Sequence, residues 1–207
     1  MLITAGGTTE PIDDIRVITN KSTGRTAAYL ADQLIESGFD VHFLHAKNSA
    51  LPQHSCSQSS FDSFHDLEMN LTELLTQNSF DWLIQAAAVS DYSIQPEAGK
   101  ISSDALEINI KLIKNKKLID QVENLSPLTK VIGFKLTSGA DADLRTTKVE
   151  KLFTESHCDF VVHNDWQQMA GGTHHFNFFS PDLSFVELKS KEELGFQLFK
   201  TLSAETL

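Results

Sequence analysis

The chain has 207 residues, of which 41% are apolar and 22% charged, a composition typical of a globular protein with one domain over residues 1–207. Its formal net charge is −11, from 17 basic and 28 acidic side chains, which argues against general nucleic-acid binding but leaves room for a small anion held by a few local donors. The sequence contains no apolar run of about 18 residues that would predict a membrane span, and no leader is visible at its start. Cys56 and Cys158 do not have the spacing of metal ligands. We therefore expect a cytoplasmic protein without membrane contact.

The first 90 residues predict alternating strands and helices. Strands are expected at 1–4, 40–45 and 81–87, helices at 23–37 and 64–77, and a surface loop at 49–63, which is rich in Ser and Gln. This order predicts an α/β, Rossmann-like fold: a mostly parallel sheet with helices on both faces.

The second half is less regular. Residues 90–105 are polar and form a candidate flap, and residues 106–113 alternate between apolar and polar, as a half-exposed strand does. The remaining elements expected are helices at 118–125, 141–156 and 191–202, strands at 130–136 and 159–163, and a small C-terminal β-hairpin from 176–179 and 183–188.

A long polar loop separates the first strand from the first helix. Gly6 and Gly7 leave the strand and permit a close approach of backbone to a ligand, and Ser22 or Thr23 is expected to cap the helix. Free N–H groups at such a helix start favour an anion. The loop is much longer than an ordinary connector, which indicates that it holds a ligand.

The third strand ends in three small residues, Ala86–Ala88, followed by Asp91. Ligands of open α/β sheets bind beyond the carboxyl ends of the strands, where small side chains let a ring or phosphate lie against the backbone. Close packing of a helix, with Asp91 as its cap, is the alternative. The lysines that could form a local phosphate site, or be ordinary solvated side chains, are Lys100, Lys111, Lys114, Lys116, Lys117, Lys148 and Lys151.

Several familiar motifs are missing from the sequence. There is no G-x-G-x-x-G fingerprint, no P-loop and no nucleophile elbow, and the Tyr-x-x-x-Lys pair of short-chain dehydrogenases is absent too. His174 and His175 have no partner at a known metal spacing, so the metal ligands stay unknown.

Taken together, these segments resemble phosphopantothenate–cysteine ligase, the second half of the bifunctional coenzyme A biosynthesis flavoproteins. Residues 4–13 (TAGGTTEPID) and 16–24 (RVITNKSTG) are similar to the signature loop of that family, and residues 86–92 (AAAVSDY) to its second motif. Weaker similarities lie at 100–101, 112–115, 133–134 and 163–165, and little resemblance extends beyond residue 165.

The resemblance implies a two-step ligation. A nucleoside triphosphate, CTP by preference or else ATP, activates the carboxylate of 4′-phosphopantothenate as an acyl-nucleotide, and L-cysteine then attacks to form an amide. It also implies Mg²⁺ bound with the triphosphate, no flavin, a homodimer, and a separate phosphopantothenoylcysteine decarboxylase as pathway partner.

The resemblance also assigns roles to residues. The catalytic residues would be Asn20, which holds the acyl group, and Lys100 on the flap, which neutralises phosphate charge. The substrate would be bound by Gly7, Arg16, Asn20, Ser22 and Gly24. The nucleotide would be bound by Ala87, Ala88, Asp91, Lys100, Lys114, Asn115, Phe134, Lys148 and Lys151, with the choice between the last two left open.

Two departures from the family pattern leave CTP and ATP as alternatives. Lys116 stands where the family has a proline, and the segment 133–138 lacks the acidic residue of the family's Gly-Phe-x-x-Glu-Thr run. The rival functions are a nucleotide- or flavin-binding protein of the same pathway without ligase activity, an NAD(P)-dependent reductase, and a non-catalytic binding module.

Overall fold

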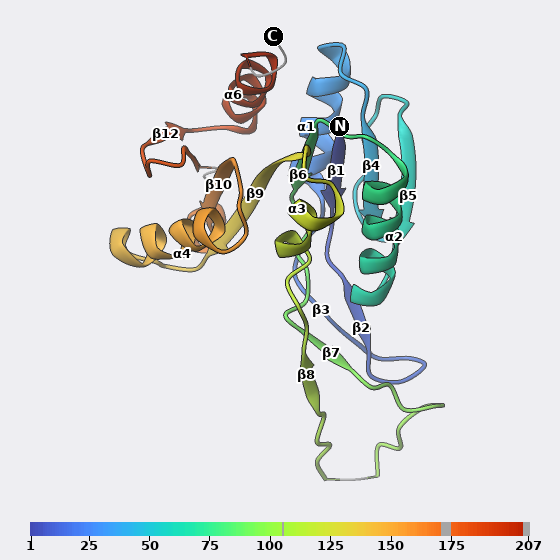
Figure 1. Cartoon of the computed structure of the whole chain (residues 1–207). Coiled ribbons are helices and arrows are strands. Elements are labelled where there is room, and N and C mark those ends of the chain that lie inside the picture. Colours follow the sequence, from blue (N-terminus) through green and yellow to red (C-terminus); the bar gives the residue numbers. More distant parts are fainter. Residues whose placement is uncertain (105, 171–174, 205–207) are drawn as a thin grey trace.

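A computed structural model describes residues 1–104, 106–170 and 175–204. One eight-stranded sheet, in the order β12-β11-β10-β9-β6-β1-β4-β5, forms its centre (Figure 1). The strands from β10 to β5 pair in parallel, and β11 and β12 add an antiparallel edge. The strands are β1 (Leu2–Ala5), β4 (His42–Ala46), β5 (Ser57–Phe61), β6 (Trp82–Gln85), β9 (Lys130–Thr137), β10 (Phe160–Asp165), β11 (Phe176–Phe179) and β12 (Phe185–Leu188).

Helices cover both faces of the sheet, which confirms the predicted fold class. The first face carries α1 (Arg25–Glu36) and α6 (Lys191–Ala204). The second carries α2 (Phe64–Gln77), the 3₁₀ turn η1 (Ile119–Gln121), α3 (Val122–Leu125) and α4 (Ala142–Thr154), and a short helix α5 (Trp166–Ala170) follows β10. Successive strand residues alternate between the two apolar layers: Ile3 and Ile84 pack with α1, whereas Leu2 and Leu83 pack with α2.

Two short antiparallel pairs leave the body together and form an arm, defined here as residues 9–19 and 92–114 except residue 105. The first pair is β2 (Thr9–Pro11) with β3 (Val17–Thr19), and the second is β7 (Tyr92–Ile94) with β8 (Leu112–Lys114). Figure 1 shows both pairs extending away from the sheet. The first of them lies within the predicted opening loop, and its strands are too short to show a period-2 signal in the sequence.

The prediction of a surface loop at 49–63 was wrong in its second part. Ser57–Phe61 is a strand, β5, which pairs with β4 at the edge of the sheet. It is polar because only Phe61 is fully buried, whereas most of its other side chains face water.

The predicted strand at 106–113 was also wrong over most of its length. Only Leu112–Lys114 forms a strand, and Ile108 and Ile110 remain exposed. In the arm, these alternating side chains have no second layer of structure to pack against, so they do not form a half-buried strand.

Smaller differences concern the ends of the elements. Helix α1 begins at Arg25, two residues later than expected, and α5 was not predicted. Residue 105, at the end of the predicted flap, and His174 lie outside the described residues. None of the described helices combines the length and the apolar character needed to cross a membrane.

Candidate active site

A cleft of about 890 Å³ opens at the carboxyl ends of the central parallel strands, a volume in the range of small-ligand pockets. It is lined by Asn20, Lys21, Ser22, Thr23, Gly24, Arg25, Thr26, Ala27, Ala86, Ala87, Ala88, Val89, Asp91, Phe134, Lys135, Leu136, Asn164, Trp166, Met169 and Phe176. Five segments far apart in the sequence therefore meet there: the opening loop with the start of α1, the residues that follow β6, the second half of β9, the end of β10 with α5, and the start of β11.

The opening loop is joined directly to the end of β6. The side-chain amide of Asn20 donates to the carbonyl oxygen of Ala88 at 3.2 Å, and Gly7 forms a parallel bridge with Ala88. A Cβ atom added at Gly7 would lie 3.0 Å from the backbone oxygen of Asn20, so a side chain there would push apart the two ends of the opening loop. The two motifs that the sequence singled out are thus adjacent walls of one cleft.

Helix α1 points its N-terminus at this cleft but is capped differently from the prediction. Its N-cap is Gly24, in the left-handed conformation with φ 68°, and no side chain caps it, so neither Ser22 nor Thr23 does. A Cβ atom at Gly24 would lie 1.8 Å from the Ser49 hydroxyl, which explains why a capping side chain has no room there. The N–H groups of the first turn have no acceptor within the helix, and no acidic residue stands there, so this end favours an anion.

Two buried threonines hold the end of β6 in place. The hydroxyl oxygen of Thr4 accepts from the N–H of Ala87 at 3.1 Å, and that of Thr8 accepts from the N–H of Ser90 at 2.9 Å. Asn115, the residue after β8, binds the same segment, because its side-chain amide donates to the carbonyl oxygen of Ser90 at 2.9 Å. The cleft wall at Ala87 and Ala88 is therefore fixed before any ligand arrives.

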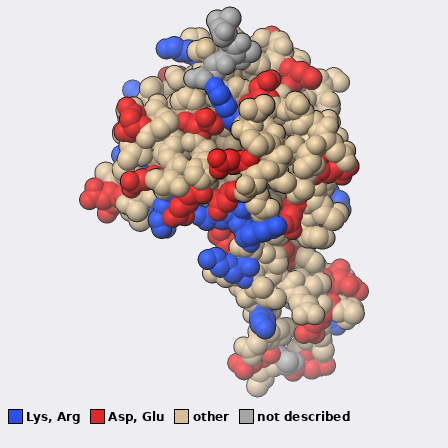
Figure 2. Space-filling view, in the orientation of Figure 1, with Lys and Arg blue, Asp and Glu red and all other residues tan. Residues whose placement is uncertain are grey.

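Lys135 is a cleft residue that the sequence reasoning missed. Burial lowers the pKa of its ammonium group, the nearby charges of Lys148 and Lys117 lower it further, and Asp91 raises it. Figure 2 shows Lys and Arg side chains gathered where the arm leaves the body, although the chain as a whole is acidic. In the sequence, the only sign of this site was that a lysine follows Gly133 within a mostly apolar strand.

Some of the residues predicted for the site line the cleft, and the others lie outside its lining. Of the predicted set, the cleft gathers Asn20, Ser22, Gly24, Ala87, Ala88, Asp91 and Phe134. Those outside the lining are Gly7, Arg16, Lys100, Lys114, Asn115, Lys148 and Lys151. Gly7 and Asn115 touch cleft segments through the contacts above, Lys148 shifts the pKa of Lys135, and Arg16, Lys100 and Lys114 belong to the arm.

The wall after β10 rests on a buried polar network. Asp165 accepts from the Thr137 hydroxyl at 2.7 Å and from the backbone N–H groups of Gly139 and Gln167. Although burial raises the pKa of Asp165, these hydrogen bonds lower it to about 2. Burial and the charge of Arg145 lower the pKa of His163 to about 4, so this imidazole is neutral near pH 7.

The carboxylates are too few for a metal cage built from protein alone. Within residues 1–104, 106–170 and 175–204, no three His, Cys, Asp or Glu side chains come together as ligands. Asp91 is the one carboxylate among the residues named as cleft lining. This donor set suits a cation that is carried mainly by the oxygens of a bound phosphate chain.

Comparison with known proteins identifies relatives over the whole chain. A family model described as DNA/pantothenate metabolism flavoprotein C-terminal domain matches residues 1–205. The chain is 29% identical over 164 residues to the coenzyme A biosynthesis bifunctional protein CoaBC of Thermococcus kodakarensis, covering 79% of this chain and 40% of that protein. For the CoaBC of Haemophilus influenzae the identity is 29% over 208 residues, covering 95% of this chain and 49% of that protein. The chain therefore spans less than half the length of each of these relatives.

Solved structures give the same picture of the fold. The DNA/pantothenate metabolism flavoprotein from Streptococcus pneumoniae superposes with a TM-score of 0.90 at 26% identity, covering 99% of this chain and 98% of the other. A Cab2 mutant in complex with phosphopantothenate-cysteine superposes with a TM-score of 0.81 at 19% identity, covering 99% and 87%, which is a likeness of fold alone.

Proposed function

Because the chain belongs to the family of DNA/pantothenate metabolism flavoprotein C-terminal domains, we propose that it is a ligase of coenzyme A biosynthesis that joins 4′-phosphopantothenate to L-cysteine. The observation that carries this proposal is the contact between Asn20 and Ala88 at the wall of the cleft. This contact supports the proposal because the Asn20 amide would then be a donor for the acyl group beside a small-residue floor for the nucleotide.

The proposed reaction has two steps. A carboxylate oxygen of 4′-phosphopantothenate attacks the α-phosphorus of CTP, or of ATP as the alternative, and the bond to the β,γ-pyrophosphate breaks. The cysteine amine then attacks the acyl carbon of the acyl-nucleotide, loses a proton and expels the nucleoside monophosphate. Both steps move negative charge within the cleft, so fixed donors and cations there lower the barrier.

The phosphates would be bound by the N-terminus of α1 and by Lys135, supported by Lys148 from α4. Ala87 and Ala88 would lie flat against the nucleotide, Asp91 would accept from its base or ribose, and Phe134 would pack beside it. Lys100 would approach from the arm as the flap closes. Asn20 would hold the acyl group for attack by the amine.

Mg²⁺ would be bound through the triphosphate oxygens, because Asp91, the one carboxylate named in the cleft lining, is assigned here to the base or ribose. When bound, it neutralises the charge on the phosphates. No flavin is proposed for this chain.

We also propose that the chain forms a homodimer through its arm. The arm exposes apolar side chains that a monomer would leave in water: Ile15, Val17, Ile18, Tyr92, Ile108, Ile110, Leu112 and Ile113. Apolar surface gathered in this way is typical of a protein interface. A cytoplasmic location and a separate decarboxylase that takes the product belong to the same proposal.

One assay tests the ligase function: release of pyrophosphate from CTP or ATP that requires both 4′-phosphopantothenate and L-cysteine for full turnover. Amide product in stoichiometric amount is expected. No turnover with either nucleotide would refute the proposal, and a bound flavin or binding of NAD(P)H without turnover would favour one of the rival functions.

A further inference from the structure

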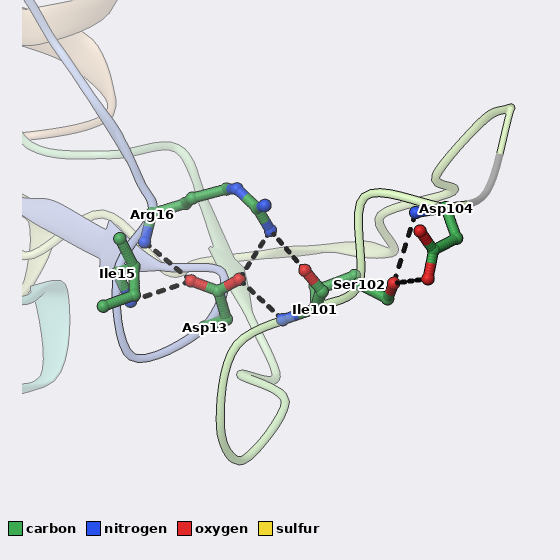
Figure 3. Close-up of polar contacts among 6 residues, drawn as sticks. All are labelled: Asp13, Ile15, Arg16, Ile101, Ser102 and Asp104. Atoms are coloured by element: carbon green, nitrogen blue, oxygen red, sulfur yellow. Dashed lines mark hydrogen bonds and ion pairs between the residues drawn. The ribbon is translucent and has the colours of Figure 1, made fainter.

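The two hairpins of the arm are tied together by one buried carboxylate. Oδ1 of Asp13 accepts from the backbone N–H groups of Ile15 at 2.8 Å and Arg16 at 2.7 Å (Figure 3). Its Oδ2 accepts from Nη1 of Arg16 at 2.7 Å and from the backbone N–H of Ile101 at 3.1 Å. The side chain of Asp13 is fully buried, so its four acceptor sites are filled by protein donors rather than by water.

The residues on both sides of Lys100 are held by hydrogen bonds to the tip of the β2–β3 hairpin. Nη1 of Arg16 also donates to the carbonyl oxygen of Ile101 at 3.2 Å, so the Asp13–Arg16 pair binds both backbone groups of that residue. On the other side, the backbone N–H of Asp14 donates to the carbonyl oxygen of Gly99 at 3.2 Å. Lys100 therefore stands between two tethered residues while its own side chain is exposed.

The same hairpin reaches the cleft at its other end. Strand β3 leads directly into Asn20, whose side chain is hydrogen-bonded to Ala88. The pairs Thr9–Thr19 and Pro11–Val17 hold β2 against β3 between these two ends. One paired ribbon thus connects the cleft wall to the segment that carries Lys100.

The charge of Asp13 keeps this tether formed. Burial raises the pKa of the carboxyl group, but the backbone N–H groups of Ile15, Arg16 and Ile101 and the Arg16 charge bring it below its ordinary value. The carboxylate is therefore ionised at neutral pH, and its hydrogen bonds to the guanidinium and N–H groups are charge-assisted.

We propose that Asp13 is a positioning residue for Lys100: through the backbone of Ile101 it anchors the flap segment at the tip of the β2–β3 hairpin. This proposal rests on the proposed ligase function, in which Lys100 meets the triphosphate. Because the anchor ties the flap segment to the β2–β3 hairpin, the two move as one unit when the flap closes, and the Lys100 backbone does not have to be ordered separately, which reduces the entropic cost of that step.

Trypsin tests the anchor directly, because the bond between Lys100 and Ile101 is a trypsin site. Asp13→Asn should expose that bond and increase its cleavage rate by about tenfold, since the amide nitrogen cannot accept from Ile101 and a hydrogen bond that ordered the segment is lost. Cleavage after Lys111, elsewhere in the arm, is the internal reference, and Asp14→Asn, which changes only an exposed neighbour, is the matched control. Unchanged cleavage after Lys100 would overturn the proposal.

Kinetics test the positioning role. Asp13→Asn should lower kcat for pyrophosphate release by roughly 10- to 100-fold and leave KM for cysteine unchanged, as misplacement of a phosphate-binding group does. If Asp13 acts through Lys100, the double variant with Lys100→Gln should be slower than Lys100→Gln alone by no more than about twofold. If the kcat defects of the two single variants multiplied in the double variant, the proposal would be contradicted.

A second variant distinguishes loss of the anchor from a general loss of structure. Ile101→Pro removes the flap-side N–H and leaves the other three bonds to Asp13 in place. It should reproduce the kcat defect with a wild-type unfolding temperature, and a wild-type kcat would overturn the proposal. If the wild-type protein releases no pyrophosphate at all, the ligase function fails, whereas the trypsin comparison still decides whether Asp13 anchors the segment.

Discussion

Asn20 and Lys135 both line the cleft, but they differ in how visible they are in the sequence. Asn20 stands within a run of residues that matches a family signature, and its amide contacts the neighbouring wall at Ala88. Lys135 stands in a strand that reads as ordinary core, and only the packing of β9 beside Asp91 and α4 gives it a role. Each leads to a prediction about a single side chain.

Asn20→Asp should keep the fold but lower the rate of amide formation by at least about 100-fold, because a carboxylate cannot donate to the Ala88 oxygen and repels an acyl oxygen. The measurements are product formation and pyrophosphate release under the same conditions. Asn48→Asp, at an exposed turn, is the matched control. A normal rate of product formation in Asn20→Asp would show that the assigned role is wrong.

Lys135→Met should reduce kcat/KM for the nucleotide by roughly 10- to 100-fold, since a charge-assisted contact to phosphate is lost while the length of the side chain is kept. Its unfolding temperature should not fall, because the substitution removes a half-buried charge that faces Lys148. Lys189→Met, on an exposed residue after β12, is the control. An unchanged kcat/KM would exclude Lys135 from the phosphate site.

At the scale of elements, the end of β10 shows how a strand is fixed by its neighbour. The Thr137 hydroxyl of β9 donates to Asp165, so it accepts from Nε2 of His163, at 2.9 Å, and the imidazole is then neutral with its proton on Nε2. Its Nδ1 faces the side-chain amide of Asn177 on β11 at 3.4 Å. Three strands are joined in this way beneath the cleft wall.

This network predicts a pH dependence of stability. The pKa of His163 is about 4 in the folded chain and 6.5 in the unfolded chain, so its contribution is complete above pH 6.5 and is lost as the pH falls toward 4. Asp165, with a pKa of about 2 against 3.8, adds a second loss at lower pH.

His163→Gln should therefore flatten the decline of the unfolding temperature between pH 6.5 and pH 4, because glutamine does not titrate. Thermal unfolding followed by circular dichroism across this range is the measurement. His65→Gln, at an exposed residue, should decline in parallel with the wild type. A parallel decline in His163→Gln would show that another group controls stability in this range.

At the scale of the whole molecule, the cleft exists because of the strand order. The sheet places β6 between β1 and β9, so the opening loop after β1 and the lysine of β9 flank the alanines that follow β6. The arm leaves the body at the same edge (Figure 1), which brings Lys100 and Asn20 into one connected unit. The arm also carries many of the apolar side chains that the described residues leave exposed.

The proposed dimer gives a prediction at this scale. Combining Ile110→Asp with Leu112→Asp, which changes side chains that are 38% and 49% exposed, should convert a dimer into a monomer, because a charge placed in an apolar interface is costly. Size-exclusion chromatography with light scattering is the measurement. Leu128→Asp, on a side chain that is 91% exposed and outside the arm, is the control. A monomeric wild type, or an unchanged dimer in the double variant, would contradict the prediction.

The sequence by itself determined what depends on local burial. The 3.6-residue spacing of Leu67, Leu71 and Leu75 predicted α2 over the residues where it is found, and the alternation of strands with helices fixed the fold class. Family motifs at residues 4–24 and 86–92 pointed to the segments that meet at the cleft.

Only the tertiary structure decided what depends on a neighbour. The polar strand β5 forms because β4 offers a free edge, whereas the alternating residues Ile108 and Ile110 find no layer to pack on. Gly24 rather than a hydroxyl begins α1 because Ser49 fills the space, and Asp13 reaches Ile101 across 88 positions of sequence. Periodicity records whether a side chain is buried but not what it contacts, and the chemistry proposed here depends on those contacts.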